Sequence, residues 1–184
     1  MNDALRTKLR LLGQRNPKPS AAVFDTQSAK AVHGGEGCGF DGYKRVKGRK
    51  RFLLVDTTGL LLSVKVIPAN ICETKAAMLG LENLSVQCAD IEQVWADQGF
   101  KGEAFAQWVK ETLGWELELT SGLSKPGKED YVVAPRRWVV ERTIAWLCQY
   151  RRLLCDFERL VEVSTNWVYA AMTILMAKRL AELS

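Results

Sequence analysis

The sequence predicts a single α/β domain in which a mixed five-stranded sheet is flanked by helices. Three observations support this class. The 184 residues suit one domain of ordinary size. Short apolar runs in the first half are joined by turn residues, which is typical of antiparallel strands. In the second half, apolar runs are separated by helical patterns, so strands and helices alternate there.

A basic lead-in, residues 1–20, comes before the first expected strand. Three leucines of this segment can share one helical face: Leu5, Leu9 and Leu12. The prolines that follow favour an extended connection. This segment is too short to hold a complete DNA-binding module, so we interpret it as a basic lead-in or the remnant of an N-terminal part, and we expect residues 21–184 to form the main domain.

The next elements follow in chain order. Residues 21–25 predict a short buried strand, and the glycine-rich residues 34–42 predict a long loop. Strands over residues 51–56 and 60–67 enclose a Thr-Thr-Gly turn, which predicts a hairpin. The sheet is therefore expected to begin with antiparallel neighbours.

The second half of the sheet is expected to alternate with helices. A helix is predicted over residues 73–83, a fourth strand over 91–96, a helix over about 102–113, and an edge strand over 115–120. Residues 122–128 have the glycine and lysine spacing of a phosphate-binding loop. A glutamate replaces the hydroxyl residue that should follow, so we interpret this segment as an ordinary surface loop.

Two helices are expected to close the chain. One begins at about Pro135, which suits a first helical turn, and runs to about Leu154. The other is expected to be capped by Ser164 or Thr165 and to run to Leu180.

The composition excludes several classes of protein. The five cysteines are odd in number and lack zinc-type spacing, so reduced thiols and a cytoplasmic location are expected. No apolar run reaches the length of a membrane span and the start lacks a signal-peptide core, so no membrane partner is expected. The single histidine, His33, lies beside two glycines, which indicates a loop rather than a histidine-based metal site.

Basic charge is concentrated in one segment. The chain has 26 Lys and Arg against 21 Asp and Glu. Six of the eight residues from 44 to 51 are basic, namely Lys44, Arg45, Lys47, Arg49, Lys50 and Arg51. Such runs are commonly solvated loops. This one leads directly into an expected strand, so we favour contacts with DNA phosphates.

Three carboxylate residues lie, in chain order, at the end of one expected strand, after another expected strand and within an expected helix. Asp25 ends the first expected strand, Asp97 follows the fourth, and Glu141 lies inside a helical pattern. Hard divalent cations prefer oxygen ligands, and two such ions stabilise the attacking and leaving oxygens of a phosphodiester. Each residue alone is more commonly a surface residue, but the set predicts a two-metal phosphoryl-transfer site.

Glu141 is expected at the border of an apolar helix face. At about 100° per residue, Arg137, Cys148 and Arg152 share its side of the helix. The apolar arc contains Val139, Val140, Trp146, Leu147, Tyr150 and Leu154. The arginines would then reach phosphates near the metals. A simple i, i+4 ion pair between Arg137 and Glu141 on a solvated face is the alternative.

Several stretches of the chain together carry a family resemblance. They are residues 25–28, 42–51 with 55–57, 96–100 and 135–143. In this order they resemble the DDE transposases of bacterial insertion sequences, specifically the insertion-sequence-five group and its relatives. The resemblance extends from about Val23 to Arg159.

The resemblance implies a ribonuclease-H-like fold, the integrase and transposase catalytic core. It implies that Asp25, Asp97 and Glu141 are catalytic and hold two Mg²⁺ or Mn²⁺ ions, which support cleavage at transposon ends and joining of the 3′-OH to target DNA. It also implies a homodimer or larger synaptic complex in the bacterial cytoplasm, associated with the nucleoid. The expected DNA contacts are Lys44, Arg45, Lys47, Arg49, Lys50, Arg51, Arg137, Arg142 and Arg152.

Two departures from the family pattern leave alternatives open. A related group has a tyrosine, arginine, glutamate and lysine signature; Arg137 matches the arginine, whereas Ala134 and Cys148 replace the tyrosine and lysine. Arg152 is expected to supply the missing charge. The chain also has a short lead-in where relatives have a helical part that recognises transposon ends. It is therefore either a catalytic half that partners a separately encoded N-terminal half or an inactive fragment. An inactive fragment would bind DNA non-specifically or partner an intact transposase.

Overall fold

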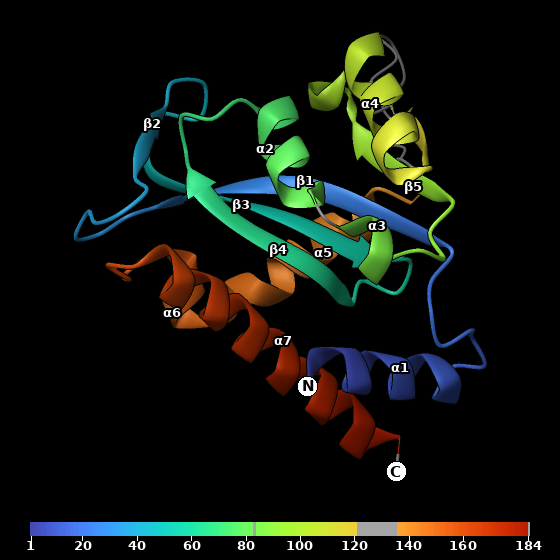
Figure 1. The fold of residues 1–184 in the computed structure, drawn as a ribbon. Coiled ribbons are helices and arrows are strands. Elements are labelled where there is room, and N and C mark those ends of the chain that lie inside the picture. The colour runs from blue at the N-terminus through green and yellow to red at the C-terminus, as the bar shows by residue number, and fades with distance from the viewer. Residues whose placement is uncertain (83, 121–135, 184) are drawn as a thin grey trace, which may run out of the picture.

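The structure, a computed structural model, describes residues 1–82, 84–120 and 136–183. Helices cover both faces of a central sheet (Figure 1). In chain order the elements are α1 (Asn2–Leu12), β1 (Ala21–Lys30), β2 (Gly39–Asp41), β3 (Val46–Asp56), β4 (Leu61–Pro68), α2 (Glu73–Leu81), α3 (Leu84–Gln87), β5 (Gln93–Asp97), the 3-10 turn η1 (Gln98–Phe100), α4 (Glu103–Leu113), β6 (Glu116–Thr120), α5 (Trp138–Cys148), α6 (Arg151–Leu154) and α7 (Val161–Glu182).

The strands form one mixed sheet. Its order is β2-β3-β1-β5-β6, and β4 also pairs with β3. The pairs β1–β3, β2–β3 and β3–β4 are antiparallel, whereas β1–β5 and β5–β6 are parallel. The predicted α/β class is confirmed, and the arrangement is consistent with the expected ribonuclease-H-like core. The short strand β2 raises the number of strands in the described part from the expected five to six.

The first strands are longer than the sequence predicted. β1 continues to Lys30 and β3 begins at Val46, because the two strands pair antiparallel as far as Lys30 and Gly48. Most of the segment predicted as a basic loop is therefore strand. The glycine-rich segment likewise contains a strand, β2.

The prediction of one continuous helix around Glu141, ending at about Leu154, is wrong in its C-terminal part. α5 ends at Cys148, and α6 begins at Arg151 after Tyr150 adopts an extended backbone with ψ of 115°. The predicted start at Pro135 and the loop over 122–128 lie outside the described residues.

The last helix begins earlier than predicted. α7 starts at Val161, so Ser164 and Thr165 lie inside it and do not cap it. The Ser164 hydroxyl donates to the Asp156 carboxylate at 2.6 Å, and the Thr165 hydroxyl donates to the Val161 carbonyl at 3.0 Å. Both hydroxyl groups are thus bonded to groups near the start of the helix rather than to its free N–H groups.

The two faces of the sheet bury different helices. Along β1, Val23 packs with residues of α5 and α7, whereas Phe24 packs with residues of α2 and α4. β3 alternates in the same way through Leu53 and Leu54. Each fully buried side chain of this size contributes about 1.5–3 kcal/mol. Figure 1 shows α2 on one side of the sheet and α7, with α1 beside it, on the other.

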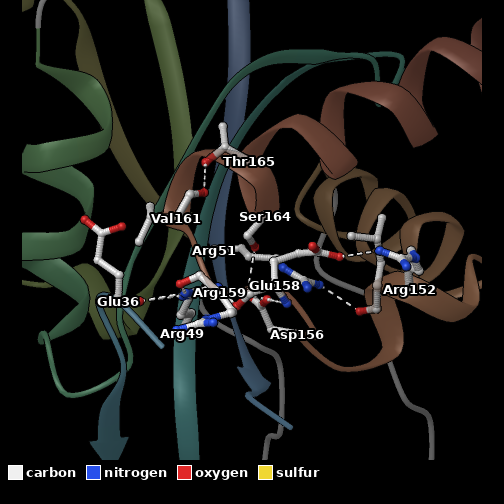
Figure 2. Close-up of polar contacts among 11 residues, drawn as sticks. Glu36, Arg49, Arg51, Arg152, Asp156, Glu158, Arg159, Val161, Ser164 and Thr165 are labelled. Atoms are coloured by element: carbon white, nitrogen blue, oxygen red, sulfur yellow. Dashed lines mark hydrogen bonds and ion pairs between the residues drawn. The ribbon is translucent and has the colours of Figure 1, made fainter. Parts of the chain in front are cut away.

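A buried ionic network ties β3 to the segment before α7 (Figure 2). Arg49 donates to the Asp156 carboxylate at 2.9 Å, and both side chains are fully buried. Arg49 also donates to the carbonyls of Glu36, Glu158 and Arg159. Every charged oxygen and donor in this contact has a partner inside the protein, which is the condition under which a buried ion pair is tolerated.

The structure also describes the state of the cysteines and the length of the apolar helices. The five cysteines are free thiols, as expected. No helix in the described part of the chain is long and apolar enough to cross a membrane.

Candidate active site

Two parallel strands bring Asp25 and Asp97 to the same side of the sheet. Val23 on β1 lies opposite Trp95 on β5. Asp25 follows Val23 by two residues, and Asp97 follows Trp95 by two residues. Side chains two residues apart lie on the same face of a strand. That face is the one covered by α5.

The environment of Asp25 raises the pKa of its carboxyl group in the metal-free protein. Burial raises the pKa of Asp25 from 3.8 to about 6, and the nearby negative charge of Asp97 also raises it. The Thr26 N–H, which donates to Asp25 Oδ1 at 2.6 Å, lowers the pKa, as do the charges of Lys44 and Arg137. The effects of burial and of the Asp97 charge outweigh these contacts, so the net pKa is raised. A bound cation would stabilise the ionised form of this carboxylate.

The raised pKa of Asp25 predicts how stability depends on pH. The folded protein holds this proton more tightly than the unfolded chain does, so stability from Asp25 is present below pH 3.8 and is lost as pH rises through about 6. Relative to Asp25→Asn, the metal-free wild type is expected to lose roughly 3 kcal/mol of unfolding free energy over this range. Urea unfolding from pH 4 to 7 measures the difference. Asp3→Asn, which changes an exposed carboxylate, is the control. If the free energy of unfolding changes with pH equally in the wild type and in Asp25→Asn, the assignment is contradicted.

Arg137 joins Glu141 to the aspartates. Its guanidinium donates to Glu141 Oε1 through Nη2 at 2.6 Å and Nε at 2.9 Å, and Nη1 lies 3.8 Å from Asp97 Oδ2. Burial alone would lower the pKa of Arg137, but the Glu141 hydrogen bond and the charges of Glu141, Asp97 and Asp25 raise it. The i, i+4 pair that the sequence suggested is present, and it is connected to the strand carboxylates rather than isolated.

The β3–β4 turn fixes the position of the Glu141 helix. The Thr143 hydroxyl donates to the Gly59 carbonyl at 2.8 Å, and Arg142 donates to the Thr58 carbonyl at 3.0 Å. The Arg142 guanidinium also stacks over the Trp138 ring at 4.1 Å. Arg142 was predicted to contact DNA, but its guanidinium is engaged in docking α5 on the turn.

A cavity of about 610 Å³ opens beside the strand carboxylates. Asp25, Asp97, Lys44 and Glu73 are among the residues that line it. Glu73, the first residue of α2, is not among the residues predicted for the site. Its sequence signal is weak, because an acidic residue in the first turn of a helix is common.

The exposed half of the basic segment lies at the turn between β2 and β3. Lys44, Arg45 and Lys47 are exposed there, next to Tyr43, whose exposure is 96%. Asp41 Oδ1 accepts from the backbone N–H groups of Tyr43 at 3.1 Å and Lys44 at 3.0 Å, which holds the turn in shape. Tyr43 and Lys44 also line the cavity, so the positive charge of Lys44 stands beside the strand carboxylates.

The other half of the basic segment is buried, which corrects the expectation that it faces DNA. Arg49, Lys50 and Arg51 have exposures of 0%, 4% and 1%. Lys50 donates to the Ile71 carbonyl and Arg51 to the Leu153 carbonyl, each at 2.7 Å. The prediction was wrong because β3 is covered on both faces, so consecutive side chains all point into the protein.

Arg152 does not share the face of Glu141. The helix break after Cys148 turns it away, and it donates to Glu158 at 2.7 Å (Figure 2). Its guanidinium also stacks over the Trp167 ring at 4.8 Å. Arg152 therefore does not supply the charge that a lysine provides in the related signature. Its exposed side chain remains at the surface.

The residues of the site fit a divalent cation by their chemistry. In the ranges that the structure describes, no group of three or more Asp, Glu, His or Cys side chains is already arranged around one point. The donors are carboxylate oxygens, which Mg²⁺ and Mn²⁺ prefer. Gly99 leaves room beside them, because a Cβ there would lie 2.9 Å from Asp97 Oδ1.

Comparison with known proteins agrees with the geometry. The transposase DDE domain matches residues 16–176, which is most of the chain. No curated protein matches the sequence. DDE transposase domains generally use divalent metal ions, act on DNA and often assemble as oligomers. The chain belongs to the transposase DDE domain family.

Proposed function

We propose that this chain cleaves DNA at the ends of an insertion sequence of the insertion-sequence-five group and joins the freed 3′-OH to target DNA. The observation that carries the proposal is the placement of Asp25 and Asp97 on neighbouring parallel strands, with Glu141 linked to Asp97 through Arg137. Membership of the transposase DDE domain family supports the same chemistry.

Asp25, Asp97 and Glu141 would hold two Mg²⁺ or Mn²⁺ ions. When bound, such ions stabilise the attacking and leaving oxygens of a phosphodiester. Arg137 holds Glu141 toward Asp97 by donating to Glu141 through Nε and Nη2. Its Nη1, which lies 3.8 Å from Asp97 Oδ2, is the donor that would reach a phosphate oxygen.

The domain organisation and assembly are part of the proposal. We take residues 21–184 as the catalytic domain and residues 1–20 as a basic lead-in to it. The lead-in helix α1 lies against α7, where Asn2 donates to the Tyr169 carbonyl at 3.2 Å. Synapsis of two DNA ends requires at least two catalytic domains, so we propose a homodimer or larger complex on DNA.

The exposed basic turn is expected to contact DNA phosphates. A Lys44→Ala, Arg45→Ala and Lys47→Ala triple variant should reduce the slope of log K against log salt by about 2.7 if each side chain neutralises one phosphate. Fluorescence anisotropy with duplex DNA from 50 to 200 mM salt measures this slope. The matched control removes three exposed lysines elsewhere, Lys8, Lys65 and Lys178. Equal slopes for the two triple variants would contradict the assignment.

The proposed reaction is tested with duplex DNA that carries the inverted repeats flanking the gene. We expect a nick with a 3′-OH at the element boundary in Mg²⁺ or Mn²⁺ and no product in EDTA. An upstream-encoded helical part should be supplied in a parallel reaction. DNA binding without metal-dependent cleavage in both reactions would contradict the proposal and favour a non-enzymatic DNA-binding fragment.

A further inference from the structure

Glu73 is a fourth carboxylate at this site and has no role in the reaction as described above. We propose that Glu73 is a further cation-binding residue, which completes the carboxylate set around the ion held by Asp25 and Asp97. The inference rests on the proposed function, because it concerns the divalent cation that the reaction requires.

The space above Gly99 is where the carboxylates of Glu73 and Asp97 converge. A Cβ at Gly99 would clash with Glu73 Oε2 and would lie 2.9 Å from Asp97 Oδ1. The Gly99 N–H donates to that same Asp97 oxygen at 2.8 Å, which fixes its direction. Glycine at this position thus leaves room for two carboxylate oxygens from different elements to approach one another.

Glu73 and Glu141 approach the site from opposite faces of the sheet. α2, which begins with Glu73, packs on the face that contains Phe24, whereas α5 packs on the face that contains Val23. Among the described residues, Glu73 lines the cavity with Asp25 and Asp97, and Glu141 does not. The carboxylates that line the cavity are therefore Asp25, Asp41, Glu73 and Asp97, which differ from the set expected from sequence.

The competing explanation for Glu73 is a structural ion pair with Lys44. Lys44 Nζ lies 3.4 Å from Glu73 Oε1, and the two side chains are 35% and 28% exposed. A long, partly exposed pair of this kind contributes little to stability. The Thr26 hydroxyl is also 3.4 Å from Glu73 Oε1, so neither contact holds the carboxylate tightly. If the role of Glu73 were only this ion pair, removing Lys44 should affect cation binding as much as removing Glu73 does.

Calorimetric titration of Mn²⁺ into the full chain without DNA tests the proposal. We expect Glu73→Gln to weaken Mn²⁺ binding by at least about tenfold, since loss of a supporting group at a metal site already costs about 10- to 100-fold. Gly99→Ala, which keeps every carboxylate but fills the space between Glu73 and Asp97, is expected to weaken binding as well. Lys44→Met is expected to bind Mn²⁺ as tightly as the wild type or more tightly.

The matched control is Glu103→Gln. Glu103 is exposed and is the first residue of α4, just as Glu73 is the first residue of α2. Removing a negative charge from a helix start therefore has the same effect in the two variants. Wild-type affinity in Glu73→Gln, or an equal loss in Glu73→Gln and Lys44→Met, would overturn the role of Glu73. Absence of Mn²⁺ binding to the wild type, or unchanged binding in Asp97→Asn, would instead overturn the proposed metal-dependent function.

Discussion

Replacing Asp97 by asparagine is expected to reduce Mg²⁺-dependent strand cleavage by at least about 1,000-fold. A bound metal ion contributes several kcal/mol of stabilisation to the transition state, and each 1.36 kcal/mol is a factor of about ten in rate. Asp97 is central because it lies at the end of β5, interacts with Asp25 and faces Arg137. Single-turnover cleavage of end-labelled DNA measures the rate. Asp25→Asn and Glu141→Gln are expected to give losses of similar size.

The cleavage defect should be separable from DNA binding. The exposed basic turn is unchanged in Asp97→Asn, so affinity for DNA is expected to stay within about twofold of wild type. Asp90→Asn, which removes a partly exposed carboxylate, is the matched control for loss of one negative charge. Cleavage by Asp97→Asn at more than a tenth of the wild-type rate would contradict the role assigned to this carboxylate.

Replacing Arg49 by methionine is expected to lower the free energy of unfolding by about 3–5 kcal/mol, because it leaves a buried charge without its partner. Asp156 is 1% exposed, and three carbonyls around Arg49 would also lose their donor (Figure 2). Urea denaturation monitored by tryptophan fluorescence measures the change.

Two further variants control the Arg49 experiment. Lys47→Met, two residues earlier on the same strand and exposed, should change stability by less than about 0.5 kcal/mol. Adding Asp156→Leu to Arg49→Met should recover part of the loss, since a buried pair can be replaced by apolar residues. A loss below about 1 kcal/mol in Arg49→Met would show that the network does not hold the segment before α7 to β3.

Local patterns in the sequence were sufficient to predict much of the fold. The Thr-Thr-Gly turn between β3 and β4, the helix α4 and the edge strand β6 are confirmed, because turn chemistry and apolar periodicity are properties of short segments. The class of the site is predicted in the same way. Asp25 and Asp97 each end an apolar run, and parallel pairing of those runs places the two side chains on one face.

Contacts between distant residues could not be predicted from such patterns. The burial of Arg49 depends on Asp156, which is 107 residues away in the sequence. Half of the basic side chains in residues 44–51 are therefore buried, although the local sequence is typical of a solvent-exposed loop. The break after Cys148 likewise separates Arg152 from Glu141 through packing rather than through a proline or glycine. Glu73 enters the cavity because α2 contacts η1, a pairing that no short motif encodes.

The measurement that tests the central claim most directly is the anomalous scattering of Mn²⁺ in crystals of the wild-type chain. The carboxylate site predicts an anomalous peak within coordinating distance, about 2.0–2.6 Å, of oxygens of both Asp25 and Asp97. The peak should be absent from crystals of Asp97→Asn grown and soaked in the same way. Mn²⁺ bound elsewhere, with none at these two aspartates, would contradict the claim that they form the metal site of this transposase domain.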